Sequence, residues 1–371
     1  MHFASDNAAG IAAPILNALT RANEGFAFGY GNDDVTERLN RRFAEVFERE
    51  VAAFLVPSGT AANALALAHL APPWGAVICH EGCHLATDEC GASEFFGGGL
   101  KLVGLKGPGG KVTASAVEAR LSHGSWGGPH HVVPAVLSVT QPTEAGTIYG
   151  LDELRELAGI AQRRGLAVHM DGARLANALA RMNITPAEAT WRSGVDVLSL
   201  GATKGGALAA EAVIFFDPSR AAGMSERRKR GGHLVSKHRF LAAQFEAFLT
   251  DDLWLSLAAH ANTMADILSA RLRAAGLRIV WPVEANEVFV VVSHRLDRRL
   301  RAAGACYYVW STQSQPDDYT LGEDELLARL VTSFATSESE IKRFAAIASA
   351  QESSTVWGGT LSLPKVSSDA G

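Results

Sequence analysis

Two residues of opposite charge each close a short apolar run: Asp171 in LAVHMDGARLANAL and Lys204 in GVDVLSLGATKGG. Both runs have the length and composition of buried strands, and they lie in successive strand units. A lysine amine can form a Schiff base with an aldehyde, while a carboxylate can keep a pyridine nitrogen protonated. Enzymes that hold pyridoxal phosphate (PLP) use both groups. The pair therefore predicts a PLP site, with Lys204 bound to the aldehyde and Asp171 facing the ring nitrogen.

Each residue also has a plainer explanation when it is taken alone. An Asp before Gly-Ala is often a turn or helix-capping residue, and a Lys after Gly-Ala-Thr is usually a solvated loop charge. The neighbours favour function, because Arg174 follows Asp171 by three residues and Gly205-Gly206 follows the lysine directly. The pair is therefore better explained as part of a site than as two separate loop residues.

A tripeptide far upstream, Ser58-Gly59-Thr60, lies between a predicted strand and an alanine-rich predicted helix. Backbone amides and two hydroxyls at the positive end of a helix dipole can hold a phosphate. An ordinary helix cap is the alternative for this tripeptide. The chain contains neither GxxxxGK[ST] nor GxGxxG, which argues against nucleoside triphosphate and dinucleotide binding.

A cofactor ring needs a group over its face, and an imidazole can fill that place and still move protons near neutral pH. His84 in HEGCHLATDEC is the first candidate, and His131 in PHHVVPAVLSVTQ is the second. A hydrogen-bonded structural histidine is the alternative for His84. Gln141 closes the apolar run that follows His131. His84, Gln141, Asp171 and Lys204 are all expected at or just beyond strand ends, where open α/β sheets bind their ligands, so Gln141 is also a candidate for binding the cofactor.

Composition limits the classes of function. The chain has 371 residues, 47% hydrophobic and 20% charged, with a net charge of -5, which suits a globular enzyme of two domains. This charge gives no general attraction to nucleic acid or anionic membranes, so a small-molecule partner is expected. Neither a secretion signal nor an apolar run long enough to cross a bilayer is present, which predicts a cytoplasmic protein.

Three of the four cysteines crowd into CHEGCHLATDEC together with two histidines. This crowding raises the possibility of zinc, but a structural zinc site usually draws on a second pair of ligands at a matching spacing. The remaining cysteine, Cys306, stands alone in CYYVW. We expect reduced thiols and no metal site.

The order of elements predicts a mostly parallel α/β sheet with crossover helices. Helices are expected over residues 36–50 and 151–165, a long helical region over about 234–275, and a last helix over 337–351 that begins near Ser337 or Ser339. We expect an N-terminal arm (1–25), a large PLP-binding domain (26–250), a smaller C-terminal α/β domain (251–350) and a flexible tail (351–371). The strands expected in the large domain are 52–56, 75–80, 134–141, 166–171, 196–200 and 211–216, and those in the small domain are 277–282, 287–294, 306–311 and 326–334.

Several segments together resemble the threonine aldolases, the glycine-producing branch of the β-eliminating lyase family. They are SDNAAG, PSGTAAN, HEGCH, HMDGARLANAL, ATKGG and ARLVTSF, in consistent order over about residues 3–348. HEGCHLATDECGASEFF and SVTQPTEAGT are most similar to the low-specificity and phenylserine aldolases. The resemblance implies an aspartate aminotransferase-like fold (fold type I of the PLP-dependent transferases) and a homodimer or homotetramer with shared active sites. The implied reaction is cleavage of β-hydroxy-α-amino acids, such as threonine, allo-threonine and phenylserine, to glycine and an aldehyde.

The resemblance also implies roles for single residues. Arg174 would contact the ring hydroxyl, Gly59 and Thr60 the phosphate, and His84 the face of the ring. The residues implied at the substrate are Ser5 and Arg329 at the carboxylate, His131 near the side chain, and Asp6 and Tyr30 as lesser candidates. The base is left open among His84, His131 and a water held by either.

One departure from the family pattern concerns the phosphate. Family members carry a glycine-rich, methionine-containing stretch that ends in an arginine, whereas this chain has ERRKRGGHLVSKHR. Arg230, Lys237 or neither takes that role, and a solvated basic helix end is the alternative. Another PLP reaction on the same fold, such as β-elimination or transamination, and a non-catalytic PLP-binding module are the competing functions.

Overall fold

The computed structural model describes residues 1–310 and 319–350. Its larger part is built on a seven-stranded sheet of order β1-β7-β6-β5-β4-β2-β3, in which β7 alone runs antiparallel to its neighbours. The carboxyl ends of the other six strands therefore share one edge with the start of β7. This confirms the mostly parallel α/β sheet predicted from sequence. The strands are β1 (Ala52–Val56), β2 (Gly75–His80), β3 (Lys101–Leu105), β4 (Val133–Thr140), β5 (Ala167–Gly172), β6 (Val197–Gly201) and β7 (Glu211–Phe215).

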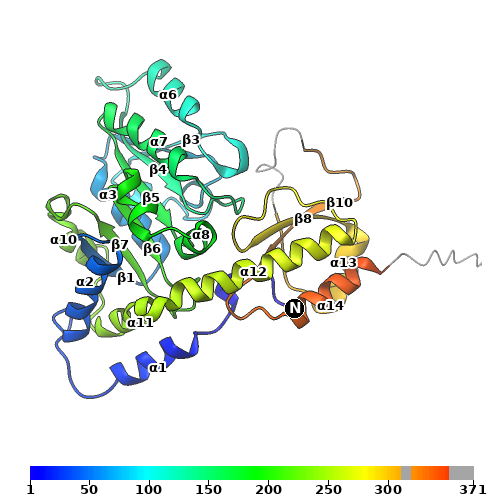
Figure 1. Ribbon diagram of the computed structural model, residues 1–371. Helices are drawn as coiled ribbons and strands as arrows, with labels where there is room; N and C mark the ends of the chain where they lie inside the picture. The colour runs from blue at the N-terminus through cyan, green and yellow to red at the C-terminus, as the bar shows by residue number, and fades with distance from the viewer. Residues whose placement is uncertain (311–318, 351–371) are drawn as a thin grey trace, which may run out of the picture.

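Helices cover both faces of this sheet (Figure 1). The largest apolar cluster joins one face to α1 (Ala13–Ala22), α2 (Asp34–Val46), α7 (Leu151–Arg163), α8 (Leu175–Met182) and α11 (Arg239–Leu249). The opposite face packs on α3 (Gly59–Leu70), whose residues 61–68 are all buried, as expected for a helix that is apolar on every side. The helices α5 (Ala92–Phe96) and α10 (Met224–Arg230) lie against α3. The remaining α-helices of this part are α4 (His84–Thr87), α6 (Ala114–His123) and α9 (Pro186–Ala189).

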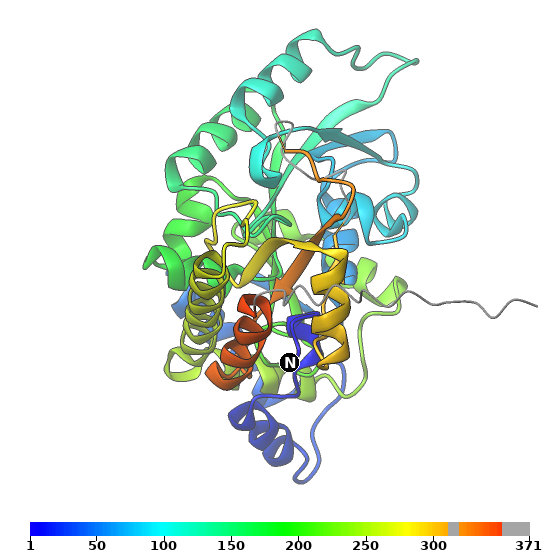
Figure 2. The same ribbon diagram turned by 90° about the vertical axis from the view of Figure 1, so that its right-hand side faces the viewer.

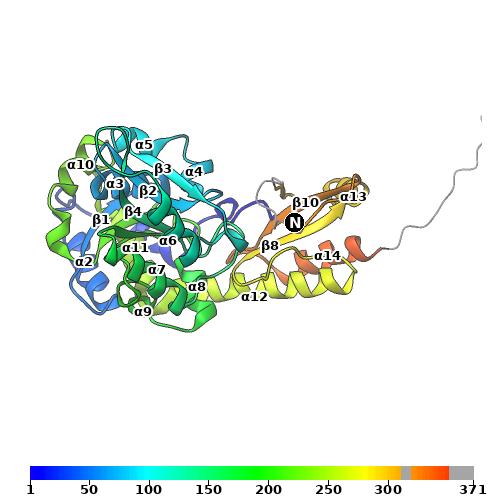
Figure 3. The same ribbon diagram turned by 90° about the horizontal axis from the view of Figure 1, so that it is seen from above.

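A smaller part follows, with an antiparallel sheet of order β8-β10-β9. Its strands are β8 (Glu287–Ser293), β9 (Tyr308–Val309) and β10 (Glu325–Val331), and its helices are α13 (His294–Ala302) and α14 (Glu338–Ser349). Ser337 caps α14 through a side-chain hydrogen bond, one of the two residues predicted to do so. The predicted strand 277–282 is wrong, because only a single bridge, Ile279 to Val290, forms there. Figure 3 shows this part beside the large sheet, with α12 (Leu253–Ala274) running along both.

The predicted helical region 234–275 is interrupted. It contains α11 and α12, which are separated at Thr250–Asp252. Asp251 and Asp252 have φ angles of 50° and 53°, in the left-handed region, which breaks the helical path. Aspartate adopts this conformation more readily than most residues do. The helix therefore breaks without a glycine or proline, and no sign of the break is visible in the sequence.

The first residues of the chain join the smaller part and not the large sheet. Met1 and Phe3 belong to its apolar cluster. The Phe3 amide donates to the Cys306 carbonyl, and the Phe3 carbonyl accepts from the Val331 amide, both at 2.8 Å. In Figure 2 the N-terminus lies among the elements of the smaller part. The chain then crosses to the larger part, where α1 packs on α11 (Figure 1). The predicted tail, residues 351–371, lies outside the described residues, and none of the described helices is long and apolar enough to span a membrane.

Candidate active site

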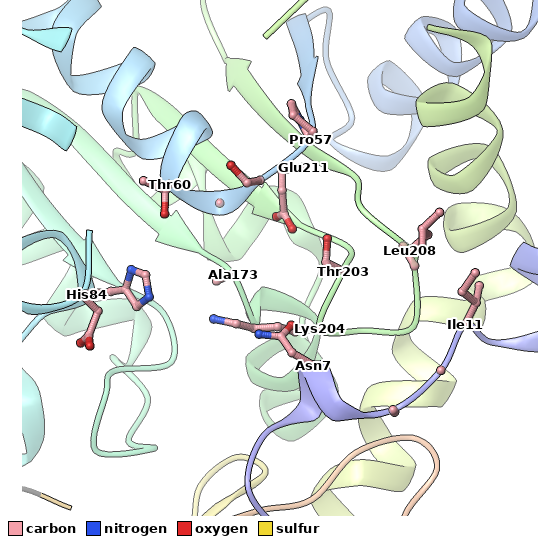
Figure 4. A pocket seen from close by; sticks show the side chains of 16 residues that line it. Asn7, Ile11, Pro57, Thr60, His84, Ala173, Thr203, Lys204, Leu208 and Glu211 are labelled. Atoms are coloured by element: carbon pink, nitrogen blue, oxygen red, sulfur yellow. The ribbon is translucent and has the colours of Figure 1, made fainter. Parts of the chain in front are cut away.

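A cavity of about 600 Å³ opens at the carboxyl edge of the large sheet (Figure 4). Its volume suits a small organic ligand. Five residues predicted from sequence line it: Ser58, Gly59, Thr60, His84 and Lys204. The lining also includes Asn7, Pro57, Asp88, Thr203, Leu208 and Glu211.

Ser58, Gly59 and Thr60 form the beginning of α3. The Ser58 hydroxyl accepts a hydrogen bond from the Ala61 amide at 3.3 Å, so the residue is a helix cap. A Cβ atom built on Gly59 would meet no atom within 4 Å, which leaves open space above the first turn. The cap and the predicted phosphate site are therefore compatible, because free backbone amides of a twelve-residue helix face a cavity.

Lys204 lies in the tight loop between β6 and β7. Gly205 permits this loop, since a Cβ atom there would come within 2.7 Å of the Phe248 ring. The lysine side chain extends into the cavity toward the side on which His84 lies (Figure 4). Its amine makes no hydrogen bond or ion pair with any residue that the structure describes. A lysine in this position has an amine available to a ligand.

A chain of hydrogen bonds joins Asp171 to His84. Asp171, at the end of β5, is buried, and its Oδ2 accepts a hydrogen bond of 2.9 Å from Asn63 Nδ2. The same amide donates to Glu89 Oε1 at 2.9 Å, and that oxygen also lies 2.8 Å from His84 Nδ1. The Ala173 amide donates to Asp171 Oδ1 at 3.0 Å. These contacts fix the aspartate carboxylate and the imidazole relative to each other.

The charges in this hydrogen-bond network favour a His84 imidazole that is protonated or shares a proton with Glu89. The hydrogen bond to Glu89 is the largest cause of a raised pKa for His84, and it outweighs the desolvation of the ring. Burial raises the pKa of Glu89, while its bonds to His84 and Asn63 oppose that rise. Because Nδ1 is occupied by Glu89, Nε2 is the ring atom left to exchange a proton with a ligand.

A second set of charges lies at the junction of the two sheets. Arg174 donates to Asp6 through Nε at 2.6 Å and Nη2 at 3.1 Å, and Asn286 Nδ2 also donates to Asp6 at 3.1 Å. Although burial opposes it, the arginine holds the pKa of Asp6 at about 2. Arg329 Nε donates to the buried Glu287 at 2.9 Å, and Arg174 Nη2 lies 3.7 Å from the same oxygen, Oε1.

The structure does not bring every predicted residue into the cavity. His131 is exposed and precedes β4, so it lies at the amino edge of the sheet in its own chain. Gln141 is buried with both ends of its amide bound to the backbone of Tyr149. Ser5 caps the turn Asp6–Ala8, and Tyr30, half exposed, lies under the Lys229 amine. None of these four lines the cavity. Four other predicted residues, Asp6, Asp171, Arg174 and Arg329, do not line it either, and the predicted roles of all eight stay predictions.

The basic stretch does not reach the cavity either. Arg230 lines a separate surface hollow beside Phe96 and His69, and Lys237 does not line the cavity. The cavity-lining residues therefore favour neither of the two residues suggested for the phosphate.

Sequence reasoning missed several charged and polar residues around the site. Asn63 follows the phosphate-type loop in PSGTAAN, and Glu89 lies in HEGCHLATDEC, so both belong to segments already singled out. Glu211 begins a strand that was predicted from its apolar residues alone. The signal that could have identified Glu211 is an acidic residue directly beside an apolar run that is expected to be buried. The missed residues are Asn7, Asn63, Asp88, Glu89, Glu144, Thr203, Glu211, Asn286 and Glu287.

Comparisons with known proteins show the family of the chain and support the fold. Residues 2–295 match the model of the β-eliminating lyase family. The chain is 40% identical to a low specificity L-threonine aldolase of a Pseudomonas species, over 93% of this chain and 96% of that one. It is 42% identical to the low specificity L-threonine aldolase of Pseudomonas aeruginosa, over 83% and 89% of the two chains.

Solved structures show the same architecture. A structure of Leishmania major threonine aldolase is 31% identical, with a TM-score of 0.87 over 94% of this chain and 98% of that one. Sphingomonas wittichii serine palmitoyltransferase, at 14% identity and a TM-score of 0.69, covers 94% of this chain and 86% of its own, and it shows the fold alone. The expected fold type I of the PLP-dependent transferases is confirmed. The two Pseudomonas relatives are named low specificity L-threonine aldolases, and the chain belongs to the β-eliminating lyase family.

Proposed function

We propose that this chain is a PLP-dependent aldehyde-lyase that cleaves β-hydroxy-α-amino acids, with threonine, allo-threonine and phenylserine as substrates, to glycine and an aldehyde. The observation that carries the proposal is the Lys204 amine. It lies without a described partner in a cavity that also contains a helix N-terminus and an imidazole. The relatives at 40–42% identity, named low specificity L-threonine aldolases, support the reaction class.

The residues around the cavity fit PLP. The open first turn of α3 at Gly59 and Thr60 would hold the phosphate, and Asp171 would face the ring nitrogen with the lone pairs that Asn63 and Ala173 leave free. When bound, PLP supplies an aldehyde to the lysine amine and a ring that accepts the electrons of the broken Cα–Cβ bond. His84 would cover the face of the ring.

Substrate orientation is assigned to the charges at the junction of the sheets. Glu287 engages Arg329 through Nε and Nη2. Among residues 1–310 and 319–350 no other side chain accepts a hydrogen bond from this guanidinium, so Nη1 and the outward N–H of Nη2 would be available to the substrate carboxylate. Ser5 and Asp6 lie in the N-terminal segment that also contributes Asn7 to the cavity. This arrangement would set which substituent of Cα lies perpendicular to the ring.

Proton transfer is assigned to His84. Its Nε2 would take the proton of the β-hydroxyl as the aldehyde leaves, directly or through a water, while Glu89 holds Nδ1. His131 is the alternative base, and it would have to come from another copy of the chain, because in its own chain it lies at the opposite edge of the sheet. Turnover of His84→Phe and His131→Phe separates these assignments, and an unchanged kcat in both would remove histidine from the role.

A product assay tests the function. The protein loaded with PLP is incubated with L-threonine, L-allo-threonine and phenylserine, and glycine and the aldehyde are measured. Equal amounts of glycine and aldehyde are expected. Formation of ammonia and a 2-oxo acid instead would identify β-elimination, and amino transfer to an added 2-oxo acid would identify a transaminase. No conversion of any of the three substrates would leave only a PLP-binding module.

We also infer a homodimer or homotetramer. Phe26 and Phe28 are fully or largely exposed on the loop that follows α1, and Leu208 on the cavity lining is 57% exposed. Apolar groups in such positions commonly mark a protein interface. Light scattering of wild type and of Phe26→Ser/Phe28→Ser tests this, with a single-chain mass expected only for the variant. A single-chain mass for both would contradict it.

A further inference from the structure

A buried glutamate, Glu211, lines the cavity beside the predicted phosphate loop (Figure 4). It opens β7, the strand that runs opposite to its neighbours, and so its side chain lies at the same edge as the carboxyl ends of β1 and β6. Glu211 pairs with Val56 of β1, and Ser58 follows two residues later. The sheet therefore places a carboxyl group next to the N-terminus of α3.

Few charges face this carboxyl group. Burial raises its pKa to about 7, and the Asp171 charge adds to the rise, while the Thr203 hydrogen bonds and the Lys204 charge oppose it. Besides Glu211, the titratable residues on the described cavity lining are His84, Asp88 and Lys204. From β1 and α3 the lining presents Pro57, Ser58, Gly59 and Thr60, which carry no charge.

A phosphate dianion on the α3 N-terminus would bring two negative charges close to Glu211. In a low-dielectric cavity, like charges at such range cannot all stay ionised without a large energetic cost, and a carboxyl group responds by taking up a proton. A neutral carboxyl group also has an O–H that can donate a hydrogen bond toward an anion.

We propose that Glu211 is a phosphate-responsive proton site: its carboxyl group, next to the N-terminus of α3, takes up a proton from solvent when the phosphate of PLP binds there. The inference rests on the proposed function, because it needs PLP in this cavity. It assigns to Glu211 a positioning role toward the phosphate, in a chain whose basic stretch puts neither Arg230 nor Lys237 on the cavity lining.

Cofactor binding is then linked to pH. Above about pH 7 the carboxyl group of the cofactor-free protein is ionised, so PLP binding requires the uptake of a proton. The PLP affinity of wild type should then fall by up to about tenfold per pH unit relative to that of Glu211→Gln, which has no titrating group at this position. Below neutral pH the carboxyl group is already protonated, and so the two proteins should converge.

Titration calorimetry of cofactor-free protein tests the proposal. Heats of PLP binding in two buffers with different ionisation enthalpies give the protons taken up per cofactor. At about pH 8, wild type should take up about one proton more than Glu211→Gln. Asp88→Asn is the matched control, since it removes an exposed carboxylate from the same cavity and should leave the wild-type proton count unchanged.

A second measurement needs no variant. Pyridoxal, which lacks the phosphate, should bind to wild type without the additional proton. Equal proton uptake by wild type and Glu211→Gln, or by wild type with PLP and with pyridoxal, would overturn the proposal. Failure of PLP to bind at all would overturn the proposed function and this inference with it, whereas binding without the proton difference overturns this inference alone.

Discussion

The imidazole of His84 illustrates how one contact can decide the role of a side chain. Glu89 occupies Nδ1 at 2.8 Å, which orients the ring and leaves Nε2 toward the cavity. The same contact raises the pKa of His84, so that the ring holds its proton to higher pH than a free histidine does. A base with a raised pKa accepts a proton more strongly, but it is available only above that pKa.

This predicts a shift in the pH profile when the contact is changed. Glu89→Gln keeps a side chain of similar shape but loses the negative charge, so the pKa of His84 falls. The acidic limb of kcat should then move to lower pH by about one unit, with a lower plateau because the base is weaker. Steady-state rates over the pH range test this, with Asp88→Asn as the neighbouring control. An unmoved acidic limb in Glu89→Gln would exclude His84 as the titrating base.

At the scale of elements, the loop between β4 and α7 is held by a side chain predicted to bind the cofactor. Gln141 Nε2 donates to the Tyr149 carbonyl, and the Tyr149 amide donates to Gln141 Oε1, both at 2.9 Å. Between these two residues lies Glu144, whose pKa is raised by burial and by the nearby Glu287 carboxylate. The amide of Gln141 therefore closes a loop that carries an acidic group toward the site.

Replacing this amide should destabilise the loop. Gln141→Leu fills a similar volume but leaves the buried Tyr149 amide and carbonyl without partners, at a cost of about 2–4 kcal/mol in the free energy of unfolding. Denaturant unfolding measures the loss. Gln141→Glu, which keeps an acceptor for the Tyr149 amide, should recover part of it. A loss below about 0.5 kcal/mol for Gln141→Leu would show that the two hydrogen bonds contribute little.

The elements that sequence predicted are those with strong apolar signals. Each strand expected in the large domain exists, because runs such as LAVHMD are buried on both faces. The edge strand β3 was missed, since its burial is irregular and a glycine lies within it. The break at Asp251 was missed because no glycine or proline marks it.

Chemistry that requires a particular residue singled out Lys204, which lines the cavity, and Asp171, which is buried at the end of β5; their roles toward PLP stay predictions. Asn63 and Glu89 were not singled out, because only the fold shows that α3 and the segment after α4 bring them between Asp171 and His84. The positions of His131 and Gln141 could not be predicted from the sequence either. Both belong to the segment around β4, but one precedes the strand and the other turns its amide into the loop.

At the scale of the molecule, one group of charges links the parts of the chain. Asp6 of the N-terminal segment binds Arg174, which lies between β5 and α8, and Asn286, which directly precedes β8. Glu287 then joins Arg174 to Arg329 of β10. The arrangement of the two sheets around the cavity therefore depends on buried ion pairs as well as on apolar packing.

Loss of one member of this group of charges should lower the stability of the folded protein. Asp6→Ala leaves the buried Arg174 charge without its main partner, which should lower the free energy of unfolding by about 3 kcal/mol at neutral pH. Denaturant unfolding of wild type and variant measures it. Asp297→Ala, which removes the partner of the more exposed Arg301, is the control and should cost less.

The sign of the pH dependence follows from the lowered pKa of Asp6. Its value of about 2 lies below the ordinary 3.8, so the stabilisation is complete above about pH 4 and is lost as the pH falls toward 2. The stability difference between wild type and Asp6→Ala should therefore shrink on acidification through that window. A difference that grows on acidification would contradict this assignment.

Lys204 should hold PLP for the cleavage of hydroxy amino acids. Borohydride reduction of the PLP-loaded protein followed by peptide mass analysis tests this role, with threonine cleavage measured on the same samples and on Lys204→Ala. We expect one modified lysine, Lys204, with loss of glycine formation after reduction, and a variant that lacks both the visible absorbance and the activity. Modification of a different lysine, or glycine formation that survives in Lys204→Ala, would contradict it.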